Sequence, residues 1–355
     1  MNRDLVLDAL GAPSAAAGEL PLVAVAGRPA TVSASWSDQA CDVAARRGSA
    51  LVVVDDDAGR SVGPRPGAAS ARPWPVVAVT TSARSARRAD FGLLVGTTGP
   101  ADHDGLDEAG AVALAARFLD RCSDGPPAPA RPGPSLVDIV PFPLDGRYDA
   151  RDVLAAVLDD GTWVEFDRAG AAEVLTAVAR IGGRSVGIAA SLPASGDGVL
   201  TPAGAARIAR LVRWCEGADR GGRPLVTFVD TDGIAPAEDG DDVRAVLDAA
   251  IAVRGSAVAK VAVVVGRCVG LGATLTAAVG GRADLVLPWP RARFARESSA
   301  RTVGNGLHDA GRPLGANAVE VARDADVFDV VHPDETRARL VEALDLLRGT
   351  REYAR

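Results

Sequence analysis

The sequence predicts an α/β fold built from two related halves, and three features support this prediction. Apolar strands alternate with amphipathic helical stretches across residues 223–287, an order typical of sheets covered by helices. Short segments of the first 95 residues recur in the same order further along the chain. A proline-rich stretch at 124–135 cannot continue a helix and suits a linker between the halves.

The repeat consists of three pairs of segments that keep their order and character. Two pairs share small and β-branched residues, and the third shares an Arg-Ala-Asp sequence. The paired ranges are 27–35 with 183–191, 51–55 with 227–230, and 88–95 with 282–287. Two copies of one β/α unit explain this recurrence, so we predict an N-terminal domain at residues 1–134 and a C-terminal domain at residues 135–355.

Three helices are predicted in the C-terminal half from apolar residues at helical spacing. Thr201 and Pro202 supply an N-cap and an N1 proline for the first, and Pro333 precedes the last. The apolar sets are Ile208, Leu211, Val212 and Cys215; Val243, Val246, Leu247, Ala250 and Ile251; and Leu340, Leu344 and Leu347. Residues 60–73 and 291–316 lack such spacing and are predicted to be mobile loops.

Two glycine turns follow the apolar strands of this half: the first turn, Asp230–Ile234, and the second turn, Gly270–Thr274. Glycine permits the close approach and unusual dihedrals that presentation of N–H groups needs. We expect the N–H groups of Gly272 and Ala273 at a helix N-terminus. If the turns converge, their N–H groups face one developing negative charge, which predicts an oxyanion site. The alternative is that each glycine serves only its own turn or local packing.

Composition and charge argue against several classes of protein. The net charge is -7 without a basic cluster, so nucleic acid is not expected as a partner. Apolar runs such as 261–265 are far shorter than the roughly 20 residues of a membrane helix. Acidic residues at positions 4, 8 and 19 do not fit a signal peptide, and a cytoplasmic location is expected.

Side chains for nucleophilic or metal chemistry are not grouped in the sequence. Ser191 lies in no G-x-S-x-G elbow, and the three histidines, His103, His308 and His332, have no informative spacing, which disfavours a serine hydrolase. Asp55–Asp57 could bind a metal, but a solvated strand end is favoured and no metal is predicted. The four cysteines, Cys41, Cys122, Cys215 and Cys268, form no C-x-x-C pair and are predicted to be free thiols.

Several segments of the second half carry a family signature. They are Tyr148–Leu154, Asp159–Gly161, Glu165–Phe166, Ile181–Ile188, Ala206–Cys215, Pro224–Asp230, Lys260 with the Gly-Ala turn, Arg282–Asp284 with Trp289–Pro290, and Val327–Arg337. Together they resemble the carboxyltransferase (β) subunit of biotin-dependent acyl-CoA carboxylases, within the crotonase-like superfamily. The resemblance covers residues 135–290 and 325–350.

The resemblance implies a fold, a site and partners. The fold would be two tandem crotonase-like domains, each a ββα spiral, with the N-terminal one reduced. The site would be an oxyanion hole made by the backbone of Gly233, Ile234, Gly272 and Ala273, which in that family binds the carboxybiotin carbonyl and holds the biotin enolate during carboxyl transfer to an acyl thioester. The substrate would be acyl-CoA or a carrier-bound thioester, and no cofactor would be bound covalently. Biotin would come on a carrier protein, and the chain would form a homo- or hetero-oligomer.

The chain departs from the family pattern between Val79 and Asp90, where no glycine stands and where the family forms its acyl-CoA hole. Arg84, Arg87 and Arg88 lie there instead, as candidates to bind a carboxylate or a CoA phosphate, with a solvated loop as the alternative. Three functions therefore stay open. They are a carboxyltransferase-like enzyme, a biotin-independent malonyl-type thioester decarboxylase or other enolate enzyme, and a non-catalytic partner subunit of a carboxylase-like complex.

Overall fold

The computed structural model describes the greater part of the chain. The described residues are 22–26, 51–55, 76–80, 83–87, 89–140, 148–167, 170–195, 198–217, 222–276, 278, 282–295, 316–317 and 329–353. The chain divides into two compact units. The first comprises Met1–Gly125, Val164–Ala169 and Glu216–Gly222, and the second comprises Pro126–Trp163, Gly170–Cys215 and Arg223–Arg355. The domain boundary predicted between residues 134 and 135 stays a prediction.

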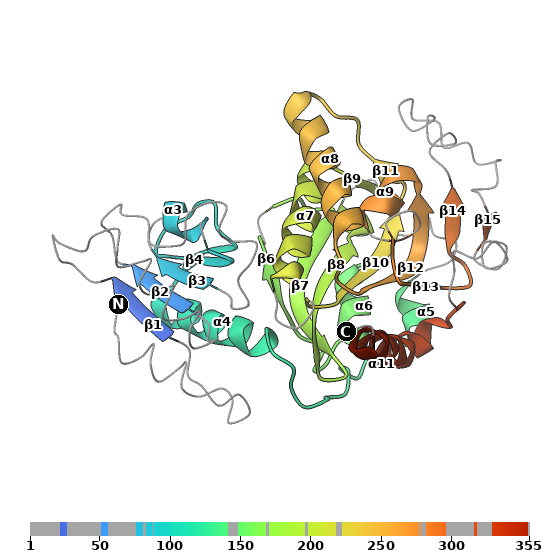
Figure 1. Cartoon of the computed structure of the whole chain (residues 1–355), viewed down its shortest axis with the longest axis horizontal. Helices are drawn as coiled ribbons and strands as arrows, with labels where there is room; N and C mark the ends of the chain where they lie inside the picture. The colour runs from blue at the N-terminus through green and yellow to red at the C-terminus, as the bar shows by residue number, and fades with distance from the viewer. Residues whose placement is uncertain are drawn as a thin grey trace. The chain divides into compact units, whose positions relative to one another are not determined.

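The first unit contains a five-stranded parallel sheet whose strands follow one another in chain order (Figure 1). The strands are β1 (Leu22–Ala26), β2 (Leu51–Asp55), β3 (Val76–Thr80), β4 (Phe91–Val95) and β5 (His103–Leu106), accompanied by helices α3 (Ala83–Ala86) and α4 (Glu108–Arg121). Phe118 of α4 stacks on Phe91 of β4 with ring centroids 4.2 Å apart, which anchors the helix to the sheet. The predicted segment 27–35 and loop 60–73 lie outside the described residues.

The second unit is built on a larger sheet in which neighbouring strands follow the order β15-β14-β12-β10-β8-β7, and β13 also pairs with β12. The strand bounds are β7 (Val174–Ile181), β8 (Arg184–Ser191), β10 (Leu225–Thr231), β12 (Lys260–Val269), β13 (Leu285–Pro288), β14 (Arg293–Ala295) and β15 (Ala316–Asn317), while most of β6 (Trp163–Phe166) belongs to the first unit. Strands β8, β10, β12 and β13 are parallel to one another. Every residue of β10 is buried, as expected for a parallel strand covered on both faces.

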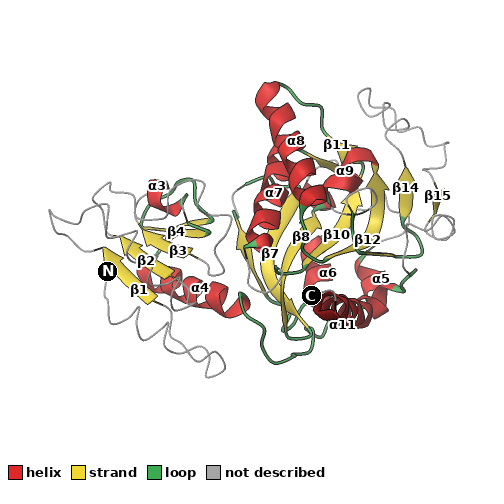
Figure 2. Ribbon diagram, viewed as in Figure 1, coloured by secondary structure: helices red, strands yellow, loops and turns green. Residues whose placement is uncertain are grey.

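Helices cover both faces of this sheet (Figure 2). Their bounds are α5 (Leu136–Ile139), α6 (Ala150–Val157), α7 (Pro202–Glu216), α8 (Gly240–Gly255), α9 (Gly270–Leu275) and α11 (Thr336–Tyr353), with 3-10 turns at Pro193–Ser195 and Pro333–Glu335. Successive side chains of a strand point to opposite faces. Val226 and Phe228 of β10 therefore share one core with α6 and α11, whereas Val229 shares another with Ala273 of α9.

The α/β architecture predicted from the sequence is confirmed, together with its three predicted helices in the C-terminal half. Helix α7 begins at Pro202, and its four predicted apolar residues are buried. Helix α11 buries Leu340, Leu344 and Leu347 as predicted. Helix α8 forms where its spacing predicted, but its buried residues are Ala249 and Val253.

The predicted linker at 124–135 has no helix, as expected, but it is held against the second unit. The N–H of Asp160 donates to the carbonyl of Pro129 at 2.9 Å, and Arg337 donates to the carbonyl of Ala128 at 2.5 Å. Arg337 also pairs with the buried carboxylate of Asp159, which accepts the N–H groups of the β7–β8 hairpin at Gly182 and Gly183. One ion pair thus connects the linker, the hairpin and α11.

The structure also bears on the predicted loop at 291–316 and on the expected absence of a membrane helix. The loop predicted at 291–316 contains strand β14, which pairs with β12 through Cys268 and Phe294. Residues 296–315 lie outside the described part. Within the described residues, no helix combines the length and the apolar character that crossing a membrane requires.

The only lysine of the sequence, Lys260, begins β12 and is 3% exposed. Its ammonium donates to the carbonyl oxygens of Ser256 at 2.7 Å and Val258 at 3.3 Å. Ser256 is the C-cap of α8, so the cation bonds to carbonyl groups at and beyond the helix C-terminus, where positive charge is favourable.

Candidate functional site

The first turn lies where β10 ends and the short strand β11 (Gly233–Ile234) begins. Strand β11 pairs in parallel with β9 (Val199–Leu200), which holds the turn from its far side. Gly233 has φ of +126°, a conformation that residues with a Cβ rarely adopt. The Thr231 hydroxyl donates to the Gly233 carbonyl at 2.9 Å and accepts from the Gly233 N–H at 3.2 Å. The Gly233 N–H therefore already has an acceptor within the turn.

The second turn follows β12 directly and forms helix α9, which begins at Gly270. Val269 is the N-cap and makes no capping side-chain hydrogen bond. Each helical N–H bonds to the carbonyl four residues earlier, so the helical acceptor of Ala273 is Val269. Gly272 lies before that first helical bond, in the part of the turn whose N–H groups point out of the helix end. The helix thus starts two residues before the N-terminus expected from the sequence.

The backbones of the two turns meet at Gly272 and Gly233. A Cβ built on Gly272 would lie 2.6 Å from the carbonyl oxygen of Gly233 and 3.0 Å from its Cα. Real Cβ atoms do not approach a backbone so closely, and only a glycine at 272 allows this contact. Two segments 39 residues apart in the sequence are therefore joined backbone to backbone.

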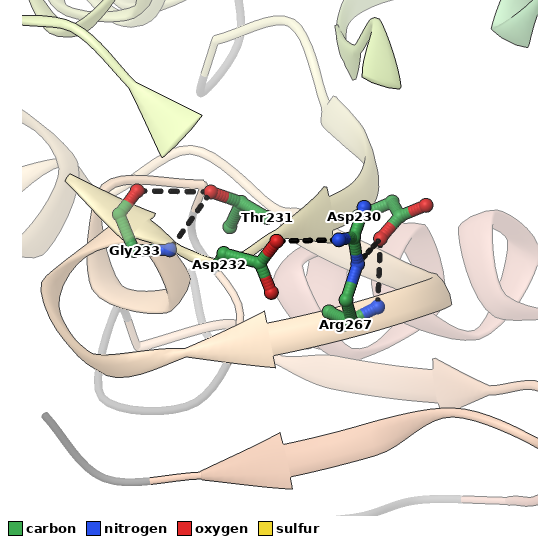
Figure 3. A network of polar contacts seen from close by, with 5 residues as sticks. All are labelled: Asp230, Thr231, Asp232, Gly233 and Arg267. Atoms are coloured by element: carbon green, nitrogen blue, oxygen red, sulfur yellow. Dashed lines mark hydrogen bonds and ion pairs between the residues drawn. The ribbon is translucent and has the colours of Figure 1, made fainter. Parts of the chain in front are cut away.

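An ion network lies at the base of the first turn (Figure 3). The backbone N–H and the Nε of Arg267 both donate to Oδ1 of Asp230 at 2.9 Å. The Nη1 of the same guanidinium pairs with Oδ2 of Asp232. Burial opposes the charge of Arg267, but the two carboxylates outweigh it and raise the pKa of Arg267 above its ordinary value. One arginine thus joins two carboxylates that flank Thr231.

Tyr148 extends this network into the protein interior. Its side chain is buried, and burial is the main reason that its pKa lies well above the ordinary value of 10.0. The charge of Asp230 and a hydrogen bond to that carboxylate raise the pKa further, while Arg267 lowers it. Tyr148 is therefore a neutral donor that helps to satisfy Asp230.

A small pocket opens beside the turns in the second unit. Asp230, Thr231 and Thr276 contribute to its wall, together with Glu173 and Ser191 from β7 and β8 or their approaches. The Thr276 hydroxyl donates to the Gly272 carbonyl at 2.9 Å, so each turn has a threonine that bonds to its glycine. The rest of the wall is mostly apolar and comes from Leu192, Pro193, Val199 and Leu200, with Gly198.

The other candidate residues are distributed as follows. Arg87 follows α3 in the first unit and is exposed, whereas Arg88 and the side chain of Arg84 lie outside the described residues. His332 is exposed, as a loop residue would be. Among the described residues, no group of three or more His, Cys, Asp or Glu side chains is placed to hold a metal ion.

Comparison with known protein families gives a match over residues 94–295 to the carboxyl transferase domain. The match covers more than half of the chain and includes both turns and the ion network. The chain belongs to the carboxyl transferase family.

Two curated relatives illustrate the similarity. The methylmalonyl-CoA decarboxylase subunit alpha of Propionigenium modestum is 29% identical over 239 residues, covering 62% of this chain and 46% of the relative. The methylmalonyl-CoA carboxyltransferase 12S subunit of Propionibacterium freudenreichii subsp. shermanii is 30% identical over 243 residues, covering 62% and 45%. The chain spans about half the length of the curated relatives it matches.

Solved structures agree on the fold. The hexameric transcarboxylase 12S, with methylmalonyl-CoA and methylmalonic acid bound, matches with a TM-score of 0.71 at 22% identity, over 89% of this chain and 76% of that one. A single-chain, multi-domain long-chain acyl-CoA carboxylase matches with a TM-score of 0.70 at 19% identity, over 87% and 37%. The crotonase-like carboxyltransferase fold predicted from the sequence is confirmed.

The sequence pattern predicts the two turns but not the ion network that connects their strands. Arg267 and Asp232 received no role, although each carries a signal. Arg267 follows the apolar run Val261–Val265 and Gly266 in the same strand, and Asp232 stands two residues after Asp230 at a strand end. A charged side chain in a buried strand needs a partner of opposite charge, and that rule points from Arg267 to these carboxylates.

Proposed function

We propose that this carboxyl transferase is an enzyme that acts on an acyl-CoA thioester through an enolate held by backbone N–H groups of the two turns. The observation that carries this proposal is the contact between the Gly233 and Gly272 backbones. This contact brings peptide groups from the ends of two strands together. The matching family is described as the carboxyl transferase domain. The sites assigned are the backbones of Gly233, Ile234, Gly272 and Ala273.

The chemistry needs donors aimed at one oxygen. Removing a proton or CO2 from the carbon next to a thioester carbonyl leaves an electron pair that delocalises onto that oxygen. Preorganised N–H groups stabilise the resulting oxyanion, and loss of one such donor typically costs about 100- to 1,000-fold in rate. Gly272 is the leading donor because its N–H precedes the first helical bond. The Gly233 N–H would be shared with the Thr231 hydroxyl, its acceptor in the structure.

The names of the relatives support a substrate class for this proposal. Those matched are named for methylmalonyl-CoA and propionyl-CoA, so we assign a CoA thioester of a short acid to this chain. Biotin on a separate carrier protein would supply or accept the carboxyl group. Arg84, Arg87 and Arg88 stay candidates for the CoA phosphates. We further propose a homo- or hetero-oligomer with a cytoplasmic location.

Decarboxylation is the second candidate, favoured by the names of two relatives. Both the Propionigenium modestum and the Veillonella parvula proteins are called methylmalonyl-CoA decarboxylase subunit alpha. In this reaction the C–CO2 bond breaks, its electron pair forms the enolate, and a proton then adds to carbon. One oxyanion site suffices for that sequence of steps, and the segment between Val79 and Asp90 provides no glycine for a second.

One pair of assays tests both candidates. The purified chain is incubated with malonyl-CoA or methylmalonyl-CoA, with and without a biotinylated carrier protein, and the CoA products are identified by mass spectrometry. Carrier-dependent loss of the carboxyl group supports carboxyl transfer, and carrier-independent loss supports decarboxylation. A folded chain that turns over neither substrate in either assay contradicts both and favours the non-catalytic partner subunit.

A further inference from the structure

The ion network of Arg267 links the two turns at their bases. Strand β12, which carries Arg267, continues directly into the second turn at Gly270. Asp230 and Asp232 belong to the first turn, and Asp232 immediately precedes Gly233. The side chain of Arg267 therefore reaches from the strand that leads into the second turn to the two carboxylates of the first turn (Figure 3).

The strand register creates the position from which Arg267 does this. Val229 pairs with Val264, but Thr231 pairs with Cys268, so three residues of β12 lie opposite the single residue Asp230. Such a bulge re-aims side chains at a strand end. A Cβ on Gly266 within it would lie 2.5 Å from Cγ of Asp230. Glycine at 266 thus lets the buried carboxylate sit against the bulge.

The network also argues against substrate binding by Arg267. Its guanidinium already faces two carboxylates, so a substrate carboxylate would have to displace one of them. Asp230 is 3% exposed at its side chain and is held by two donors from Arg267, which makes that displacement costly. The backbone of Gly198 lies over the outer pair, because a Cβ there would be 3.0 Å from Nη2 of Arg267 and from Oδ2 of Asp232.

We propose that Arg267 is a positioning residue: by holding Asp230 and Asp232 it sets the approach of Gly233 to Gly272, and hence the direction of the backbone N–H groups at the site. Its catalytic consequence rests on the proposed function, whereas its effect on the turns does not. A planar guanidinium can bond to two carboxylates in fixed directions, but the ammonium of a lysine is a point charge. Arg267→Lys keeps the charge and loses that geometry.

The test combines hydrogen exchange with kinetics. For Arg267→Lys we expect faster amide exchange in peptides covering Asp232–Ile234 and Gly270–Ala273. We expect kcat for acyl-CoA turnover to fall by about 10- to 100-fold, as small misplacements at a reacting centre do, with KM changed less than about threefold. Arg339→Lys is the matched control, since Arg339 pairs with Asp329 and Glu342 at the surface, and neither readout should change.

A second variant covers the case in which Arg267→Lys does not fold. Asp232→Asn keeps the shape of the side chain and the buried Asp230 pair while it removes the outer charge. The same faster exchange and lower kcat are expected, and the double variant should add little to the stronger single one, since both remove one interaction. Unchanged exchange in both turns, in either folded variant, overturns the inference. Faster exchange in a chain whose wild type turns over no thioester upholds the positioning role and refutes the proposed function.

Discussion

At Gly272 the missing side chain is what the neighbouring backbone requires. Gly233 fills the space that a Cβ would need, and that space is bounded by peptide atoms that cannot move as a flexible side chain would. A glycine in a turn can serve either of two roles, to allow unusual dihedral angles or to let two backbone segments approach closely, and the sequence does not tell them apart. At Gly272 the structure shows the close approach of two backbone segments.

Gly272→Ala should accordingly force the turns apart. We expect acyl-CoA turnover to fall at least about 100-fold, the cost of losing one oxyanion donor, while the fold persists. Steady-state kinetics and circular dichroism check the two parts. Gly349→Ala is the control, because its Cβ would meet nothing within 4 Å in helix α11, and there the change should stabilise the chain by up to about 1 kcal/mol. Full activity in Gly272→Ala would remove the oxyanion assignment.

The candidate site was predictable at its glycines but not at its charges. Gly233 and Gly272 stand at strand ends, where the pattern of apolar strands and turns points to them directly. The pairing of Arg267 with Asp230 and Asp232 depends on a register shift between β10 and β12, and no local pattern encodes such a shift. By contrast, the bond from the Gly233 N–H to the Thr231 hydroxyl has a local signal, because a threonine hydroxyl can accept from the N–H two residues further on.

Among the elements, helices α7 and α8 show that apolar spacing predicts where a helix forms but not always which of its faces is buried. Both helices form where the spacing predicts them, because apolar residues at helical spacing indicate the local backbone conformation. In α7 the apolar residues face the sheet, but in α8 Val243, Leu247 and Ile251 are 48%, 56% and 70% exposed. The buried side of α8 is made of Ala249 and Val253 instead. Spacing thus predicts the helix, while the face it buries depends on the neighbours it meets.

The same truncation on these two helices should give different losses of stability. Leu211→Ala in α7 removes a side chain that is 2% exposed, and the free energy of unfolding should fall by about 3 kcal/mol. Leu247→Ala in α8 removes a largely exposed side chain and should change it by less than about 0.5 kcal/mol. Urea unfolding followed by circular dichroism compares the two. Equal losses of unfolding free energy in the two variants would contradict the exposure of Leu247 in α8.

At the scale of the whole molecule, the predicted α/β class and crotonase-like fold agree with the structure, because alternating strands and helices leave few alternatives. The sequence could not predict that the proline-rich linker would be bonded to Asp160 and Arg337, since those contacts join residues far apart in the chain.

The stability of the folded chain should depend on alkaline pH through Tyr148. Its folded pKa is raised, so its contribution is fully present below the unfolded value near 10 and is lost as pH rises through the folded pKa. Tyr148→Phe removes the bond to Asp230 and should lower stability at pH 7.5 by about 1 kcal/mol. Above pH 10 the gap between variant and wild type should narrow. Urea midpoints at pH 7.5 and 10.5 test this, and a constant gap would argue against a neutral, buried phenol.

The burial of Lys260 has a consequence for chemical labelling. Because the sequence contains one lysine and its amine is bonded to carbonyl oxygens inside the fold, the native protein presents no lysine amine to solvent. An acylating reagent such as an N-hydroxysuccinimide ester should modify this side chain only after α8 and β12 separate. The fraction of modified peptide, measured over time by mass spectrometry, would then give the rate at which the sheet opens at Lys260.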